Sequence, residues 1–146
     1  MAENKKVRNA TAIEYEGIQF KSRLERACYI RLKSEGFTPL YEPTHYVLLP
    51  PFKLNNGVIY APKKKDLSLY TSFRALTYTP DFEFTYKGIH VFYDAKGMPN
   101  DTYPLKKKLF ISYLENLQIP YIFFEPHNLA QLEQSIQILY ELHSKN

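Results

Sequence analysis

The clearest alternation of apolar and polar positions lies between residues 82 and 93. Apolar and polar residues alternate along Phe82–Tyr86 and again along Ile89–Tyr93, and Lys87-Gly88 separates the two runs. A period of two is typical of a strand with one buried face, and a glycine-containing pair between two such runs is typical of a tight turn. We therefore predict an antiparallel hairpin whose loop is Lys87-Gly88.

The length of this loop decides which residues face one another. With a two-residue loop, Tyr86 faces Ile89, and the same register places Asp81 opposite Asp94. Directly opposed side chains have Cβ atoms roughly 4.5–5.5 Å apart, and like charges at that distance are destabilising. A three-residue loop would shift the register by one and separate the two aspartates.

Other apolar patterns predict the elements around the hairpin. Apolar positions recur at helical spacing over Phe20–Lys33, Leu105–Leu117 and Leu129–Tyr140, whereas Thr44–Leu49 and Ile119–Phe124 read as strands. The predicted order is α-β-β-β-α-β-α, an α/β fold with a mixed β-sheet flanked by helices. The strand, helix and strand at the C-terminal end predict a parallel crossover.

Polar residues mark where the helices begin and end. We predict that Ser22 or an earlier residue starts the first helix, that Gly36 ends it, and that Asn128 caps the last one. The segment Asn100–Pro104 predicts the start of the middle helix. Its expected buried face carries an apolar residue at every fourth position, with two more alongside: Leu105, Leu109, Tyr113 and Leu117, and Phe110 and Leu114.

Composition favours one folded domain. The chain has 146 residues, of which 45% are hydrophobic and 16% aromatic. Residues 1–16 are polar and basic and are expected to form a flexible arm, followed by a single domain over 17–146. Residues 53–72 form a long connection, and Phe73–Thr79 predicts a strand that continues into the hairpin.

Charge and cysteine content narrow the class of protein. The net charge of +4 favours an anionic partner, and the single cysteine, Cys28, excludes a disulfide framework and is expected in the core. We find neither a signal-peptide pattern nor an apolar run long enough for a membrane span. An intracellular, cytoplasmic protein is expected.

The opposed aspartates predict a metal site. A fold retains Asp81 opposite Asp94 most readily when a hard cation bridges them, and Lys96 lies two residues further on the same face. An all-oxygen site suits Mg²⁺ or Mn²⁺ better than Zn²⁺. The alternative from the pattern alone is an acidic, solvated face without a metal.

A lysine beside such a site favours phosphodiester hydrolysis. The metal would activate a water molecule, and Lys96 would orient that water while donating to the phosphate. The lysines of 106–108 begin a helix, where cations are unfavourable unless something anionic lies nearby. The residues predicted to contact nucleic acid are Lys63, Lys64, Lys65, Arg74, Lys106, Lys107 and Lys108.

These residues carry a family resemblance. Pro80-Asp81, then 12 residues, then Asp94-Ala95-Lys96 resembles the signature of PD-(D/E)xK nucleases, and Glu25 matches the acidic residue on their first helix. The chain more closely resembles the phage DUF1064 family, related to Holliday junction resolvases. That resemblance runs from about Gly17 to Phe110.

The resemblance implies a restriction-endonuclease-like core and a set of roles. Asp81, Asp94, Glu25 and the Ala95 carbonyl would hold the metal, and Lys96 would be the catalytic lysine. The implied activity is Mg²⁺-dependent endonucleolytic cleavage of DNA, including branched DNA, by a phage or mobile-element protein. Junction resolution would require two active sites, and hence a homodimer.

Two other classes of function stay open at this point. A nucleic-acid-binding module of the same fold would bind DNA in a salt-sensitive way without cleaving it. A protein-interaction domain that uses its aromatic surface would bind no DNA at low salt. The intact set of two acids and a lysine favours the nuclease.

Overall fold

The structure is a computed structural model that describes residues 13–60, 71–97 and 100–144. Within these ranges the chain is a mixed α/β fold with helices α2 (Arg23–Ser34), α3 (Tyr103–Leu117) and α4 (Leu129–Ser144). The strands are β1 (Glu14–Tyr15), β2 (Ile18–Gln19), β3 (Leu40–Tyr41), β4 (Tyr46–Leu49), β5 (Phe52–Lys53), β6 (Ser72–Phe73), β7 (Leu76–Tyr78), β8 (Phe82–Tyr86), β9 (Ile89–Tyr93) and β10 (Tyr121–Phe124).

The predicted hairpin forms the middle of the main sheet. Strands β8 and β9 pair antiparallel with Tyr86 opposite Ile89, so the predicted register is confirmed. Lys87 and Gly88 both have positive φ, at 52° and 81°, which is the backbone of the tight turn that matches strand twist. The sheet order is β10-β9-β8-β3, and β10 runs parallel to β9, as the predicted crossover requires.

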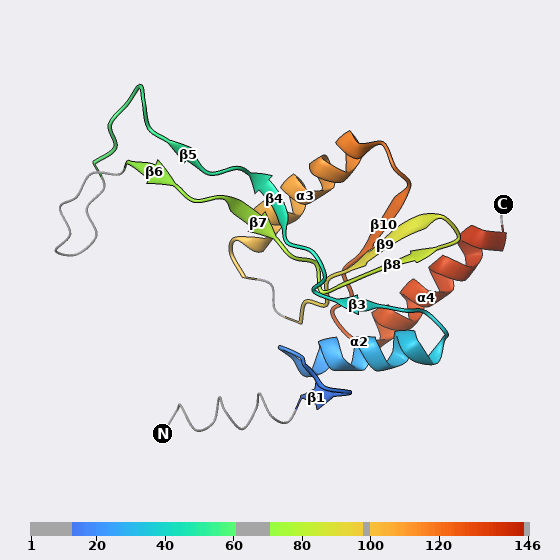
Figure 1. Cartoon of the computed structure of the whole chain (residues 1–146). Helices are drawn as coiled ribbons and strands as arrows, with labels where there is room; N and C mark the ends of the chain where they lie inside the picture. The colour runs from blue at the N-terminus through green and yellow to red at the C-terminus, as the bar shows by residue number, and fades with distance from the viewer. Residues whose placement is uncertain (1–12, 61–70, 98–99, 145–146) are drawn as a thin grey trace, which may run out of the picture.

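Helices cover both faces of this sheet (Figure 1). Helices α2 and α4 bury the face that carries Phe82, Val91 and Tyr93. On the opposite face, Phe92 packs with Phe110 and Leu114 of α3. The hairpin is therefore apolar on the face towards α2 and α4, whereas its other face combines Phe92 with Glu83, Thr85 and His90.

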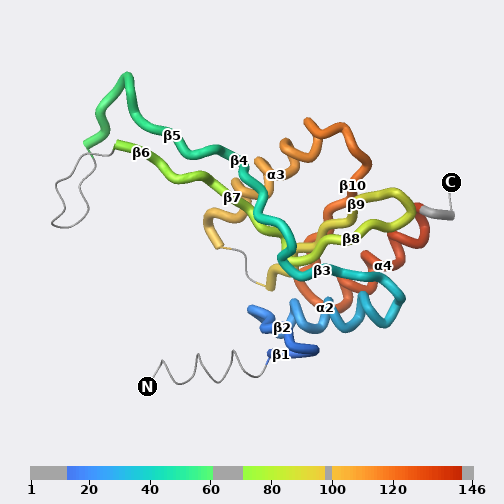
Figure 2. The backbone as a smooth tube through the Cα atoms, viewed as in Figure 1, coloured from blue at the N-terminus to red at the C-terminus, as the bar shows by residue number. Residues whose placement is uncertain are grey.

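A long two-stranded arm leaves the sheet (Figure 2). Strand β7 pairs antiparallel with β4, and β6 pairs with β5 further out along the same ribbon. The predicted long strand from Phe73 into the hairpin is thus wrong. Pro80, which lacks an amide hydrogen, stands between β7 and β8, so the chain changes partner there.

The sequence pattern did not predict two short strand pairs. Strand β1 pairs with β2, so residues 13–16 belong to a hairpin and not to the predicted flexible arm, whose remaining residues lie outside the described ranges. Strand β3 pairs with β8 at the edge of the main sheet. Each of these strands has only two residues, too few to produce a visible alternation.

The predicted helix ends are largely confirmed. Ser22 accepts a hydrogen bond from the Glu25 amide at 3.1 Å, so α2 begins after Phe20 and not before it. Gly36, with φ at 93°, follows the C-terminus, and the Phe37 amide reaches back to the Leu32 carbonyl at 3.2 Å. This is the glycine-dependent end typical of helices.

The two later helices are capped by asparagines. The Asn100 side chain accepts from the Tyr103 amide at 2.9 Å, and Asn128 accepts from the Gln131 amide at 2.9 Å. Pro104 stands in the first turn of α3, as predicted.

The predicted buried face of α3 is confirmed at Phe110 and Leu114 but wrong at its ends. Leu105 and Leu117 are 59% and 45% exposed, whereas Tyr103, Phe110 and Leu114 are buried. Each step of four residues advances about 40° beyond a full turn, so a series of four such positions drifts off any single face. The buried positions are instead separated by seven and four residues.

Two further predictions concern single features. Cys28 is fully buried, as predicted, and burial raises the pKa of its thiol to about 12. None of the described helices is both long enough and apolar enough to cross a bilayer.

Because Phe82 belongs to the core and Phe52 does not, replacing each by alanine should lower the free energy of unfolding by different amounts. Phe82 is fully buried and Phe52 on the arm is 44% exposed. We expect Phe82→Ala to lower the free energy of unfolding by about 3–5 kcal/mol. We expect Phe52→Ala to lower it by less than about 1 kcal/mol. Urea denaturation followed by circular dichroism measures both, and equal losses would contradict the assignment.

Candidate active site

The predicted acids meet at one end of the hairpin. Asp81 directly precedes β8 and Asp94 directly follows β9, so the confirmed register brings them together beyond the last pair, Phe82 and Tyr93. Asp81 is 8% exposed and Asp94 is 1% exposed. Two carboxyl groups buried side by side are rare unless something compensates their charge.

Neighbouring groups compensate part of that charge. The Ala95 amide donates to Asp81 Oδ2 at 2.8 Å, and the Tyr78 hydroxyl donates to Asp94 Oδ2. Lys96 Nζ lies 3.2 Å from Asp94 Oδ1, but that oxygen accepts no well-directed hydrogen bond from any described residue. Asp94 Oδ1 is therefore a buried oxygen atom with room for a further electropositive partner.

Burial raises the pKa of both acids, and for Asp81 the charge of Asp94 raises it further. For Asp81, burial comes first and the charge of Asp94 second, and together they raise its pKa to about 8. Burial also raises the pKa of Asp94, against hydrogen bonds from Tyr78 and the charge of Lys96. Near neutral pH the pair therefore retains a proton that a bound cation would displace.

Glu25 lies near this pair and is buried, at 6% exposed. Its carboxylate accepts hydrogen bonds from Tyr41 at 2.7 Å and from Ser22 at 3.2 Å. The charge of Glu25 contributes to the raised pKa of Asp81. A glutamate beside an apolar stripe is usually solvated, so its burial points to a role in the site.

The described residues offer two carboxylates for one cation, not three. Among them, no group of three or more His, Cys, Asp or Glu side chains comes together closely enough to hold a metal ion. Asp81 and Asp94 would be the direct ligands, while Glu25 would act through water. Buried, oxygen-only ligands with an unpartnered Oδ1 fit Mg²⁺ or Mn²⁺.

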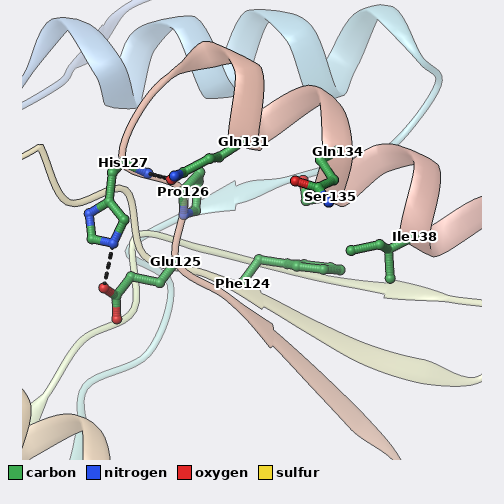
Figure 3. A pocket seen from close by; sticks show the side chains of 8 residues that line it. All are labelled: Phe124, Glu125, Pro126, His127, Gln131, Gln134, Ser135 and Ile138. Carbon is green, nitrogen blue, oxygen red and sulfur yellow. Dashed lines mark hydrogen bonds and ion pairs between the residues drawn. The ribbon is translucent and has the colours of Figure 1, made fainter.

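A second charged cluster lies beside Lys96. Glu125 follows β10 and accepts from Tyr103 at 2.9 Å and from Lys107 at 2.7 Å. His127 Nε2 lies 3.0 Å from the same carboxylate, as Figure 3 shows. Burial would raise the pKa of Glu125, but the hydrogen bonds from Lys107 and Tyr103 outweigh it, so its pKa lies below the usual value.

This cluster is tied to the backbone of Lys96. The Lys96 amide donates to the Pro126 carbonyl at 3.1 Å, and His127 Nδ1 lies 2.5 Å from the Lys96 carbonyl. A pocket of 320 Å³ opens between the end of β10 and α4, with Glu125 and His127 on its wall (Figure 3). The loop that lines the pocket is thus hydrogen-bonded to the segment that carries Asp94 and Lys96.

The structure distinguishes the predicted nucleic-acid-binding lysines. Lys107 forms an ion pair with Glu125. This carboxylate is the nearby anion that we expected beside lysines at the N-terminus of a helix. Lys108 is exposed and Lys106 is half-buried, and Arg74 is exposed between β6 and β7. Lys63, Lys64 and Lys65 lie outside the described residues.

Sequence reasoning missed several residues of the site: Tyr41, Tyr78, Tyr103, Glu125 and His127. One signal for Glu125 was available. Asp94 and Glu125 each follow a strand of a predicted parallel pair, and the carboxyl ends of parallel strands meet at one edge of a sheet. No comparable signal marks the tyrosines, because the chain has 13 of them.

Comparison with known proteins gives a family. The profile described as "Protein of unknown function (DUF1064)" matches residues 5–127. No curated protein and no solved structure is significantly similar to the chain. Because the matched residues span most of the sequence, this chain belongs to the DUF1064 family.

Proposed function

We propose that this protein is a Mg²⁺- or Mn²⁺-dependent endonuclease of the PD-(D/E)xK superfamily, with a restriction-endonuclease-like core. The observation that carries the proposal is the buried pair Asp81 and Asp94 with Lys96 Nζ 3.2 Å from Asp94 Oδ1. A protein keeps such a pair at a cost in stability, which binding of a cation and chemistry would justify.

Each residue has a role in phosphodiester hydrolysis. Asp81 and Asp94 would hold the cation, with Glu25 through water and the Ala95 carbonyl as a further ligand. The bound cation would lower the pKa of its water and neutralise charge on the phosphate. Lys96 orients the attacking water and donates to the phosphate oxygen, which stabilises the charge that develops there.

DNA is the proposed substrate, including branched DNA of the Holliday junction kind. The positive net charge and the exposed Lys108 and Arg74 support an anionic polymer as partner. A homodimer would supply the two active sites that junction resolution needs. We further propose that the protein acts in the cytoplasm of the cell in which a phage or mobile element replicates.

Removing an acid or the lysine tests the reaction. We expect Asp94→Asn and Lys96→Met each to reduce Mg²⁺-dependent cleavage of labelled four-way junction or duplex DNA by roughly 10²-fold or more. Lys87→Met, at the opposite end of the hairpin, is the matched control and should cleave as the wild type does. Undiminished cleavage by the Asp94 variant would rule out the proposed site.

The raised pKa of Asp81 allows a test of the metal site that needs no DNA, because it predicts how the stability of the protein depends on pH. Its carboxyl keeps a proton in the folded state up to about pH 8 but loses it near pH 4 when unfolded. The folded state then binds more protons over this window, so the metal-free protein should lose stability as pH rises from 4 to 8. Asp81→Asn should flatten this slope in thermal denaturation.

Added Mg²⁺ or Mn²⁺ should reverse this loss. The increase in melting temperature should be larger at pH 8 than at pH 5, because the proton competes with the cation for the same oxygens. Asp81→Asn should abolish the increase. A metal effect that is equal at both pH values, or that survives this substitution, would show that the ion binds elsewhere.

The exposed lysine of α3 tests DNA contact. We expect Lys108→Ala to weaken binding to unrelated DNA sequences equally and to reduce the slope of log affinity against log salt by about 0.9. Lys87→Ala is the control for loss of one positive charge. Fluorescence anisotropy over a salt series measures both, and an unchanged slope would remove Lys108 from the interface.

A further inference from the structure

We propose that Tyr103 is a positioning residue for Lys96: its ring holds the ammonium group against the acid pair. This inference rests on the proposed function, since it concerns the lysine of the same site. Lys96 Nζ lies 4.8 Å from the centre of the Tyr103 ring and 3.2 Å from Asp94 Oδ1. The ammonium group is therefore confined between a carboxylate and an aromatic ring.

Lysine needs such confinement. Its ammonium is strongly hydrated and sits on a flexible chain of four carbons, and the Lys96 side chain is 29% exposed, so water is within reach. An ammonium within about 6 Å of an aromatic ring centre is attracted to the ring. The ring thus favours the conformation in which Lys96 faces Asp94 over one extended into solvent.

Tyr103 is itself held firmly. Its side chain is buried, at 3% exposed, its hydroxyl donates to Glu125 at 2.9 Å, and its amide donates to the cap residue Asn100 at 2.9 Å. Its ring lies 6.4 Å from that of Tyr78, the tyrosine that donates to Asp94. The ring is fixed from the backbone, from its tip and from its side.

The charged cluster around Glu125 would help to position Lys96 in this arrangement. Glu125 anchors the Tyr103 hydroxyl and also binds Lys107, whose Nζ lies 5.4 Å from the centre of the same ring. Lys107 therefore neutralises the anchor while it contacts the ring. His127 joins the same carboxylate to the backbone carbonyl of Lys96. Both the side chain and the main chain of the lysine are thus held through Glu125.

The first test is spectroscopic and requires no cleavage. The ring current of Tyr103 should shift the ε-methylene protons of Lys96 upfield in the wild-type protein, with the resonance assigned by its loss in Lys96→Arg. Tyr103→Leu should return the resonance to its ordinary position, whereas Tyr103→Phe, which keeps the ring, should retain the shift. Tyr113→Leu, on the same helix, is the control and should leave the resonance in place.

The second test is kinetic. In Mg²⁺-dependent cleavage, Tyr103→Leu should lower kcat by roughly 10-fold to 100-fold, as expected for a misplaced catalytic group, with little change in KM. Tyr103→Phe should restore most of this loss. If Tyr103→Leu does not fold, Tyr103→Met, which fills similar volume without a ring, takes its place in both tests.

The outcomes separate this inference from the proposed function. A Lys96 resonance that is unshifted in the wild type, or unmoved by loss of the ring, overturns the positioning role whether or not the protein cleaves DNA. Wild-type cleavage combined with an unchanged kcat in the ring-free variant also overturns it. A shifted resonance in a protein that cleaves no DNA upholds the geometry and rejects the nuclease.

Discussion

The structure depends on the enforced proximity of two buried acids. A two-residue turn at one end of the β8–β9 hairpin places Asp81 and Asp94 together at the other end, between helices that exclude water from both faces. The free-energy cost of that proximity is reduced by the Ala95 amide, the Tyr78 hydroxyl and the Lys96 ammonium group. The tyrosines and lysines around the site are explained most simply as donors of hydrogen bonds and positive charge that offset the cost of burying two acids together.

The fold places the apolar core and the candidate site in different parts of the main sheet. Apolar side chains fill the face of the sheet towards α2 and α4, and the acidic groups of the site collect at the edge where β8 begins and β9 and β10 end. That edge receives Asp94 from one strand and Glu125 from its parallel neighbour, since parallel strands present their carboxyl ends together. The acid pair and the Glu125 cluster are therefore products of the same topology.

Local patterns were sufficient to predict the centre of the site. The hairpin register, the caps at Ser22 and Asn128 and the burial of Cys28 depend on residues a few positions apart, and the sequence states them directly. Pairings between distant segments left no such signal. The β4–β7 ribbon joins residues about thirty positions apart. The burial of Glu25, on helix α2, depends on Tyr41 of strand β3, which is distant in the sequence. The buried face of α3 was predicted at Phe110 and Leu114 but not at its ends, because a spacing of four alone does not follow a helix face.

The root of the arm has a mechanical consequence. Tyr78 is the residue of β7 that pairs with Tyr46 in β4, and the same Tyr78 donates its hydroxyl to Asp94. Pro80, between β7 and β8, leaves the chain almost no slack before Asp81. The ribbon and the acid pair therefore share one residue, Tyr78, so a displacement of β7 would move the hydroxyl that donates to Asp94.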